Sequence, residues 1–214
     1  MWKKEKFQLN YITGNKDVKK IMQMTIFNTP VISTFCRCLA RLMLLAAGWK
    51  ITGERPAEKK YVMIAAPHTS NWDFFFGLLM NLYFKNDIYW MGKKQIFRFP
   101  FSLIMKWFGG IPVDRNRSTN LVSAVVEEFK RSSSLVVAVP PEGSRSKVDS
   151  WKTGFYYIAS GAGVPILLAF LDYGKKTGGY GPLFIPTGDI DGDMIRIKEF
   201  YKDIHGKINS RKSI

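Results

Sequence analysis

A short polar stretch at residues 66–73 constrains the fold more than any other part of the chain, because it lies between two apolar runs. The run before it, residues 61–65, has the length and composition of a buried strand. The run after it, residues 74–80, is expected to form a buried helix. Most of the polar residues in between are types that cap helices. His68 is therefore expected at a strand-to-helix turn, at the sheet edge where the sites of open α/β proteins collect.

His68 and Asp73 form a pair whose spacing can be interpreted in two ways. Five residues along a continuous helix correspond to about 500° of rotation, which would place the two side chains on separate faces. They can meet only if the chain turns between them. If they meet, the carboxylate accepts the proton of one imidazole nitrogen and leaves the other free as a general base. On spacing alone, a histidine that caps a turn and an aspartate that caps a helix is the simpler interpretation.

Patterns typical of strands and of helices alternate along the rest of the chain. Strands are expected at residues 61–66, 88–91, 135–139 and 166–170, with short end strands at 183–185 and 194–197. Helices are expected at residues 74–84, 119–131 and 155–160, and a turn at 174–181. A chain of 214 residues is long enough for one such domain. We therefore predict an α/β fold, a single domain with a mainly parallel or mixed central sheet flanked by helices.

Two segments precede this domain, which we place at residues 51–214. Residues 1–20 form a basic N-terminal segment, and residues 21–50 form an apolar helical segment expected to contact a membrane. Its longer apolar piece carries only Arg37 and Arg41 as charges, four residues apart and so on one helical face. Two central arginines make a membrane span costly. Two interpretations stay open: a helix in the membrane interface with its arginines toward lipid phosphates, or an ordinary core helix.

The formal net charge of +15 calls for an anionic partner, either nucleic acid, an anionic membrane surface or a phosphorylated substrate. Residues 93–101 interleave cations with bulky apolar groups, a mixture that suits a membrane surface and also single-stranded nucleic acid. The charge is spread over both ends of the chain and no RNA or DNA motif is present, so nucleic acid is not expected. Cys36 and Cys38 lack companion ligands, and no metal site is expected.

Two further polar loops follow apolar strands, at residues 110–115 and 141–146. Each supplies an arginine, Arg115 and Arg145, whose planar fork can donate two parallel hydrogen bonds to a phosphate. Gly143 lets backbone N–H groups approach an anion. Taken singly, each arginine is an ordinary surface charge. Together with a His–Asp pair at the same sheet edge, they indicate a base beside an acceptor that carries both a phosphate and a hydroxyl.

In this order, the motifs resemble those of the glycerolipid acyltransferases, the family typified by 1-acylglycerol-3-phosphate O-acyltransferase. His68 and Asp73 match the family's first motif, His-x4-Asp, and residues 110–115 look like the second. The sequence Pro-Glu-Gly-Ser-Arg-Ser at 141–146 is similar to the third, usually Phe-Pro-Glu-Gly-Thr-Arg-Ser. Residues 163–166, Gly-Val-Pro-Ile, match the fourth. The resemblance covers about residues 60–170.

The resemblance implies a membrane-associated enzyme at the cytoplasmic face of the cell membrane, bound peripherally or as a monotopic protein. It would move a fatty acyl group from acyl-CoA or acyl-ACP to a lysophospholipid such as 1-acylglycerol-3-phosphate, giving phosphatidic acid. By this resemblance His68 deprotonates the acceptor hydroxyl, Asp73 orients His68, and no acyl-enzyme or cofactor is required. The substrate-binding residues would be Arg115, Glu142, Gly143, Ser144, Arg145 and Pro165, the last in the apolar wall near the acyl chain.

Three positions depart from the family pattern. Pro67 precedes the histidine where a polar residue is common, Pro140 replaces the usual phenylalanine, and Ser144 replaces threonine while keeping the hydroxyl. The change at Pro140 alters the packing behind the acceptor loop. Two alternatives therefore stand beside the main prediction: an O-acyltransferase for another lyso-lipid, such as a lyso-amino-acid lipid, and a catalytically silent lipid-binding protein.

Overall fold

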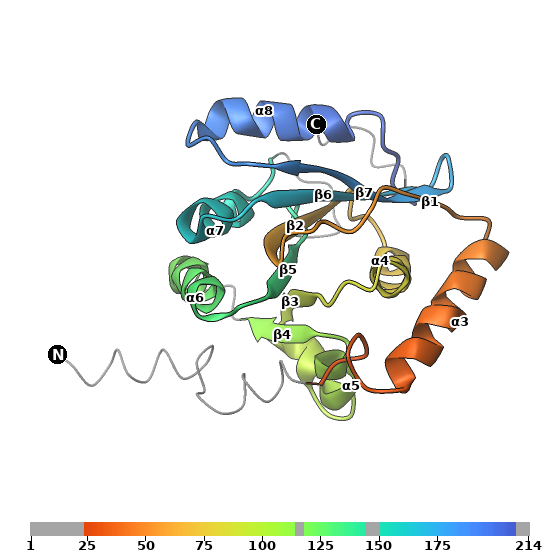
Figure 1. Ribbon diagram of the computed structural model, residues 1–214. Coiled ribbons are helices and arrows are strands. Elements are labelled where there is room, and N and C mark those ends of the chain that lie inside the picture. Colours follow the sequence, from red (N-terminus) through yellow and green to blue (C-terminus); the bar gives the residue numbers. More distant parts are fainter. Residues whose placement is uncertain (1–23, 114–117, 144–149, 209–214) are drawn as a thin grey trace, which may run out of the picture.

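The computed structural model describes residues 24–113, 118–143 and 150–208. Within them, seven strands form one mixed sheet in the order β1-β7-β6-β2-β5-β3-β4 (Figure 1). The strands are β1 (Lys50–Thr52), β2 (Lys60–Ala66), β3 (Tyr89–Lys93), β4 (Gly110–Val113), β5 (Leu135–Val139), β6 (Ile166–Asp172) and β7 (Thr177–Phe184). Neighbouring strands are parallel except β6 and β7, which are antiparallel. The predicted α/β fold with a mainly parallel sheet is confirmed.

Helices cover both faces of the sheet. They are α3 (Ile32–Ala46), α4 (Asn71–Tyr83), α5 (Ser102–Trp107), α6 (Ser118–Arg131), α7 (Gly154–Ala162) and α8 (Ile190–Tyr201), with a 3₁₀ turn at Lys94–Phe97. Side chains of α6, α7 and α8 pack on one face of the sheet, and those of α3 and α4 pack on the other. Figure 1 shows α6 and α7 on the side opposite α3 and α4.

The central strand β2 is buried on both faces of the sheet. Its side chains alternate between the two faces, as strand geometry requires. Val62 and Ile64 point into the core beneath α6, α7 and α8, whereas Tyr61 and Met63 point into the core beneath α3 and α4. All four side chains are buried. A strand that is covered on both faces reads as a continuous apolar run, which is why it could be predicted from the sequence.

The turn predicted at residues 174–181 is confirmed at residues 174–176 and wrong from Thr177 onward, where the chain forms β7. Its glycines are there for close packing. A Cβ on Gly178 would lie 2.4 Å from Met80 Cε, and one on Gly181 would lie 2.4 Å from Phe200 Cζ. Gly179 lies so close to β1 that a Cβ would be 2.0 Å from the Thr52 carbonyl oxygen. Glycine within a strand can mark such a close approach as well as a turn.

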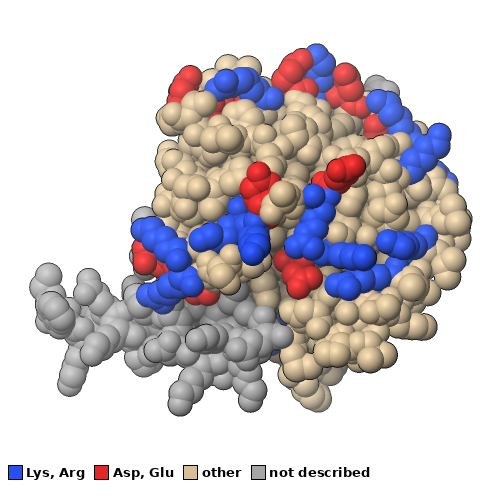
Figure 2. Space-filling model, in the orientation of Figure 1, with Lys and Arg blue, Asp and Glu red and all other residues tan. Residues whose placement is uncertain are grey.

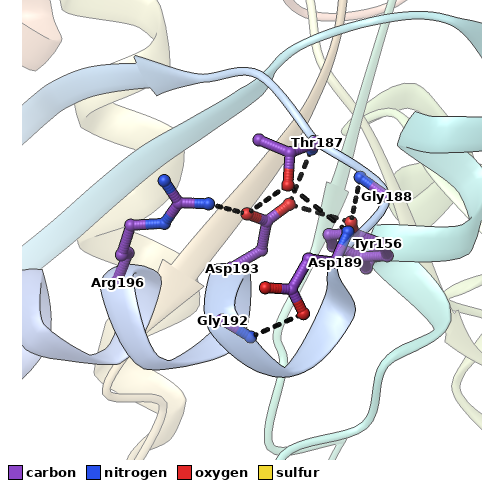
Figure 3. Close-up of polar contacts among 7 residues, drawn as sticks. All are labelled: Tyr156, Thr187, Gly188, Asp189, Gly192, Asp193 and Arg196. Atoms are coloured by element: carbon purple, nitrogen blue, oxygen red, sulfur yellow. Dashed lines mark hydrogen bonds and ion pairs between the residues drawn. The ribbon is translucent and has the colours of Figure 1, made fainter.

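The predicted end strand at residues 194–197 is also wrong, since these residues lie in α8. Asp189 begins this helix by accepting a hydrogen bond from the Gly192 N–H at 3.1 Å. One turn later, the carboxylate of Asp193 is fully buried and accepts hydrogen bonds from Tyr156 Oη at 2.8 Å and from Arg196. Figure 3 shows this cluster joining α8 to α7.

Thr187, in the loop between β7 and α8, adds two further hydrogen bonds to the carboxylate of Asp193. Its backbone N–H donates to Asp193 Oδ2 at 2.7 Å, and its hydroxyl donates to Asp193 Oδ1 at 2.9 Å (Figure 3). Both carboxylate oxygens are therefore satisfied by neighbours that come from two helices and the loop. A buried polar network of this kind specifies one packing arrangement of the elements that it joins.

Helix α3 places its arginines differently from the interfacial arrangement that the sequence left open. Arg37 donates to the Phe27 carbonyl oxygen at 2.7 Å, and the Arg41 guanidinium lies 5.4 Å from the ring centroid of Tyr83 on α4. Both arginines thus rest on the body of the protein. The helix packs through Ala40 and Leu44, which are buried.

The opposite side of α3 is apolar and exposed. Its outer face, which we define as Ile32, Phe35, Leu39, Leu42 and Leu45, includes Phe35 at 67% and Leu42 at 63% exposed. Figure 2 shows charged side chains in a band across the middle and top of the molecule, with little charge at the lower right, where α3 lies. Among the described helices, none is both long and apolar enough to cross a bilayer.

Candidate active site

The turn between β2 and α4 carries His68. Strand β2 ends at Ala66 and α4 begins at Asn71, three residues earlier than predicted. The early start has a local cause, because Ser70 and Asp73 form a capping box. The turn bends the chain tightly enough to bring His68 Nδ1 within 3.4 Å of Asp73 Oδ2. The pair that the sequence left open therefore does meet in the fold.

Asp73 is held from several sides. Its Oδ2 accepts the backbone N–H groups of Thr69 and Ser70, each at 2.6 Å, and its Oδ1 accepts the hydroxyl of Tyr173 at 2.8 Å. Burial alone raises the pKa of the Asp73 carboxyl, but the hydrogen bonds from His68, Ser70, Tyr173 and Thr69 outweigh it and hold the pKa below its usual value. Asp73 is therefore an anion at neutral pH.

The imidazole of His68 is oriented by this anion. Nδ1 faces Asp73, so Nε2 is the nitrogen left for a substrate, and the side chain is 26% exposed. An imidazole with one nitrogen held by a carboxylate and the other accessible can take a proton from a nearby hydroxyl. This is the arrangement required of a general base.

Glu142 reaches the same turn from the loop after β5. Its Oε1 accepts the backbone N–H of His68 at 3.1 Å, and the residue is only 7% exposed. Burial raises the pKa of the Glu142 carboxyl, an effect that the bond from the His68 N–H only partly offsets. Gly143 follows with a φ of +66°, a backbone conformation that favours glycine. Of the predicted substrate-binding residues, Glu142 thus contacts His68 directly, and Gly143 is its neighbour in the chain.

The remaining predicted residues are placed differently or lie outside the structure. Pro165 precedes the amino end of β6, and its carbonyl oxygen accepts the Val62 N–H at 3.0 Å. Because β6 is parallel to β2, Pro165 lies at the edge of the sheet opposite His68. Arg115, Ser144 and Arg145 lie outside the described residues.

Two features of the site could not be found from the sequence patterns. Tyr173 follows β6 and contacts Asp73 from 100 residues away. In addition, residues 205–208, which we call the strap, lie across the turn. The Ile208 N–H donates to Thr69 Oγ1 at 3.3 Å, and Lys207 Nζ lies 4.4 Å from the ring centroid of Trp72. The sequence showed only a basic tail here.

The strap lies close to the turn because of Gly206. A Cβ at this position would lie 2.6 Å from Thr69 Cγ2, so a larger residue would push the two segments apart. Within the part of the chain that the structure describes, no group of three or more His, Cys, Asp or Glu side chains is placed to hold a metal ion.

The His–Asp turn and most of the strands of the mixed sheet lie within a stretch of the chain that matches a known protein family. The acyltransferase family model matches residues 49–168, and the chain belongs to this family. Membership implies an acyl donor and a lipid acceptor. No curated protein matches the chain.

Among solved structures, the chain is similar to the 1-acyl-sn-glycerophosphate (LPA) acyltransferase PlsC from Thermotoga maritima. The TM-score is 0.54 at 14% sequence identity, and the match covers 90% of this chain and 88% of that chain. At this identity the similarity shows a shared fold.

Proposed function

We propose that the protein transfers a fatty acyl group from acyl-CoA or acyl-ACP to the hydroxyl of a lysophospholipid such as 1-acylglycerol-3-phosphate, giving phosphatidic acid. The observation that carries this proposal is the geometry of His68, whose Nδ1 is held 3.4 Å from the buried Asp73 while its side chain is 26% exposed. The family supplies the reaction class, and the similarity to the LPA acyltransferase supports this choice of acceptor.

The proposed reaction uses the pair as a base. His68 Nε2 takes the proton of the acceptor hydroxyl while the hydroxyl oxygen attacks the carbonyl carbon of the thioester. The tetrahedral intermediate then collapses, the carbon–sulfur bond breaks, and the imidazolium returns its proton to the thiolate. Asp73 stabilises the imidazolium that forms in between, as a buried carboxylate does in other histidine-based acyl transfer.

The neighbouring residues have proposed roles in binding and support. Glu142 fixes the backbone of His68. The Gly143 N–H donates to the Pro140 carbonyl oxygen at 3.1 Å, so Gly143 is proposed to serve substrate binding by shaping the loop, with the φ of +66° that favours glycine. Arg115, Ser144 and Arg145 are proposed to bind the phosphate and glycerol of the acceptor, since arginine forks match phosphate geometry. Pro165, at the opposite sheet edge, is left out of the site.

A thiol-release assay tests the function directly. The protein would be given acyl-CoA or acyl-ACP with 1-acylglycerol-3-phosphate, with a lyso-amino-acid lipid, or with no acceptor. We expect thiol release that depends on 1-acylglycerol-3-phosphate and yields phosphatidic acid by mass spectrometry. Release with the lyso-amino-acid lipid alone would overturn the choice of acceptor. No acceptor-dependent release in any arm would favour a silent lipid-binding protein instead.

We further propose that the protein attaches to the cytoplasmic face of the cell membrane through apolar contacts, peripherally or as a monotopic protein. The outer face of α3 is one part of the contact. The segment after β3 adds Phe99, which is 95% exposed, and the exposed Phe101 and Leu103. Exposed apolar side chains gathered on an amphipathic helix are typical of interfacial binding.

Replacing Phe35 and Leu42 by serine is therefore expected to weaken vesicle binding. Each side chain gains roughly 1.5–3 kcal/mol when fully transferred from water, so the pair should lower the partition coefficient at least about tenfold. Co-sedimentation with phosphatidylcholine–phosphatidylglycerol vesicles measures this effect. The matched control is Ile195→Ser on α8, where the side chain is 70% exposed but lies on another helix. Equal binding by both variants would contradict the proposed contact.

A further inference from the structure

Tyr173 is a rigidly held hydroxyl donor beside the proposed base. It follows β6, and its backbone N–H donates to the His205 carbonyl oxygen at 2.8 Å. Its ring packs against Trp49 at 5.1 Å and Phe76 at 6.1 Å between centroids. The main chain and the ring of Tyr173 are thus held by contacts that do not depend on the hydrogen bond from its hydroxyl to Asp73. Burial raises the pKa of the Tyr173 hydroxyl, which keeps its proton throughout the range of catalysis.

The two oxygens of Asp73 have different neighbours. Oδ2 is shared by the N–H groups of Thr69 and Ser70 and by the imidazole of His68. Oδ1 accepts the hydroxyl of Tyr173. The two backbone bonds belong to the helix cap and would hold the carboxylate at the turn without Tyr173. Rotation of the carboxylate about its Cβ–Cγ bond would move both oxygens, so the bond at Oδ1 adds a second, independent restraint on the orientation of the carboxylate.

Resting on the proposed function, we propose that Tyr173 is a positioning residue of the acyl-transfer reaction. Its hydrogen bond fixes the orientation of the Asp73 carboxylate toward His68 and draws part of the carboxylate's charge toward Oδ1. Both effects act on His68 and not on the substrate. Tyr173 therefore sets the geometry and the basicity of the general base, without touching the reacting atoms.

The substitution Tyr173→Phe tests this role because it removes the hydroxyl and keeps the ring. We expect kcat to fall about tenfold, because a carboxylate held by one bond fewer keeps His68 less well aligned with the acceptor hydroxyl. KM for donor and acceptor should stay the same. The freed Asp73 oxygen would leave more negative charge facing His68, so the imidazolium is stabilised and the acidic limb of the kcat/KM profile moves to higher pH.

Two controls separate positioning from a structural contribution. Tyr157→Phe removes a hydroxyl from a tyrosine that is 54% exposed on α7, and it should change neither kcat nor the pH profile. Placing 3-fluorotyrosine at position 173 gives a stronger donor of nearly the same shape, so the acidic limb should move to lower pH. Shifts in opposite directions would not arise from a change in packing.

An NMR titration makes the test independent of activity. The chain has two histidines, so the signal of His68 can be assigned by comparison with a His205→Gln variant. Tyr173→Phe should raise the titration midpoint of His68. An unchanged midpoint together with kcat within twofold of the wild type would overturn the role of Tyr173. If the wild-type protein showed no acyl transfer but Tyr173→Phe still raised the midpoint of His68, the result would support the role of Tyr173 in positioning His68. It would overturn only the proposed function.

Discussion

Replacing His68 with alanine is expected to reduce acyl transfer to background while leaving the fold and vesicle binding intact. A positioned general base contributes roughly 10²–10⁴-fold to a rate, and the structure offers Nε2 of His68 as that base, oriented by Asp73. The His68 side chain is 26% exposed and belongs to neither hydrophobic core. The measurement is thiol release at saturating donor and acceptor, together with vesicle co-sedimentation.

His205→Ala is the matched control for this substitution. The contact of His205 with Tyr173 is made by its main-chain oxygen and survives the loss of the imidazole. Most of the activity should therefore remain. If His68→Ala kept its activity, His68 would not be the base and the proposed mechanism would be wrong. If it lost vesicle binding or its thermal unfolding transition as well, the loss of activity would reflect the fold.

Replacing Asp193 with alanine is expected to lower the free energy of unfolding by about 3 kcal/mol, the cost of losing several hydrogen bonds to one buried charge and of leaving the buried Tyr156 hydroxyl without an acceptor. The substitution strips an acceptor from Tyr156, from both groups of Thr187 and from Arg196. These groups connect α7, α8 and the loop between β7 and α8. Urea unfolding measures the loss.

Asp189→Ala is the matched control, because Asp189 caps the same helix from an exposed position. Loss of a helix cap costs typically about 1 kcal/mol. Similar losses for the two variants would show that the buried cluster adds nothing beyond a helix cap, contrary to this expectation.

The effect of Asp193 should also depend on pH. Burial by itself raises the pKa of the Asp193 carboxyl, but the hydrogen bonds from Thr187, Tyr156 and Arg196 hold the pKa below its usual value. A carboxyl whose pKa is lowered by folding contributes its stability above its unfolded pKa of about 3.9, and loses it as the pH falls through the folded value. The difference between wild type and Asp193→Asn should therefore be full at neutral pH and shrink below about pH 4.

The sequence predicted those strands whose burial is visible in their own residues. Strand β5 was predicted at 135–139 and observed at Leu135–Val139, because an apolar, β-branched run between two polar loops has few other structures available. The first five residues of β7 were taken for a turn because their glycines are explained only by Met80, Thr52 and Phe200, which come from other elements. The start of α8 depends in the same way on contacts with Tyr156.

The predicted site divides along similar lines. His68 and Asp73 could be paired from sequence because a single turn contains both. Glu142 was predicted to bind substrate, whereas its observed contact is with the backbone of His68, which no motif records. Tyr173 could not be found because nothing near it in the sequence marks it, and only the pairing of β2 with β6 brings it to Asp73. The roles of Arg115, Ser144 and Arg145 stay predictions.

The strap has a consequence for how the site is assembled during folding. Its bond from Ile208 to Thr69 joins residues 139 positions apart, so the chain must close one of its longest loops before the turn at His68 has all its neighbours. Residues 205, 207 and 208 of the strap are exposed, and segments with few buried contacts are the first to open locally. The amides around Thr69 should therefore exchange with solvent more readily than those of β2, although only a few residues separate them.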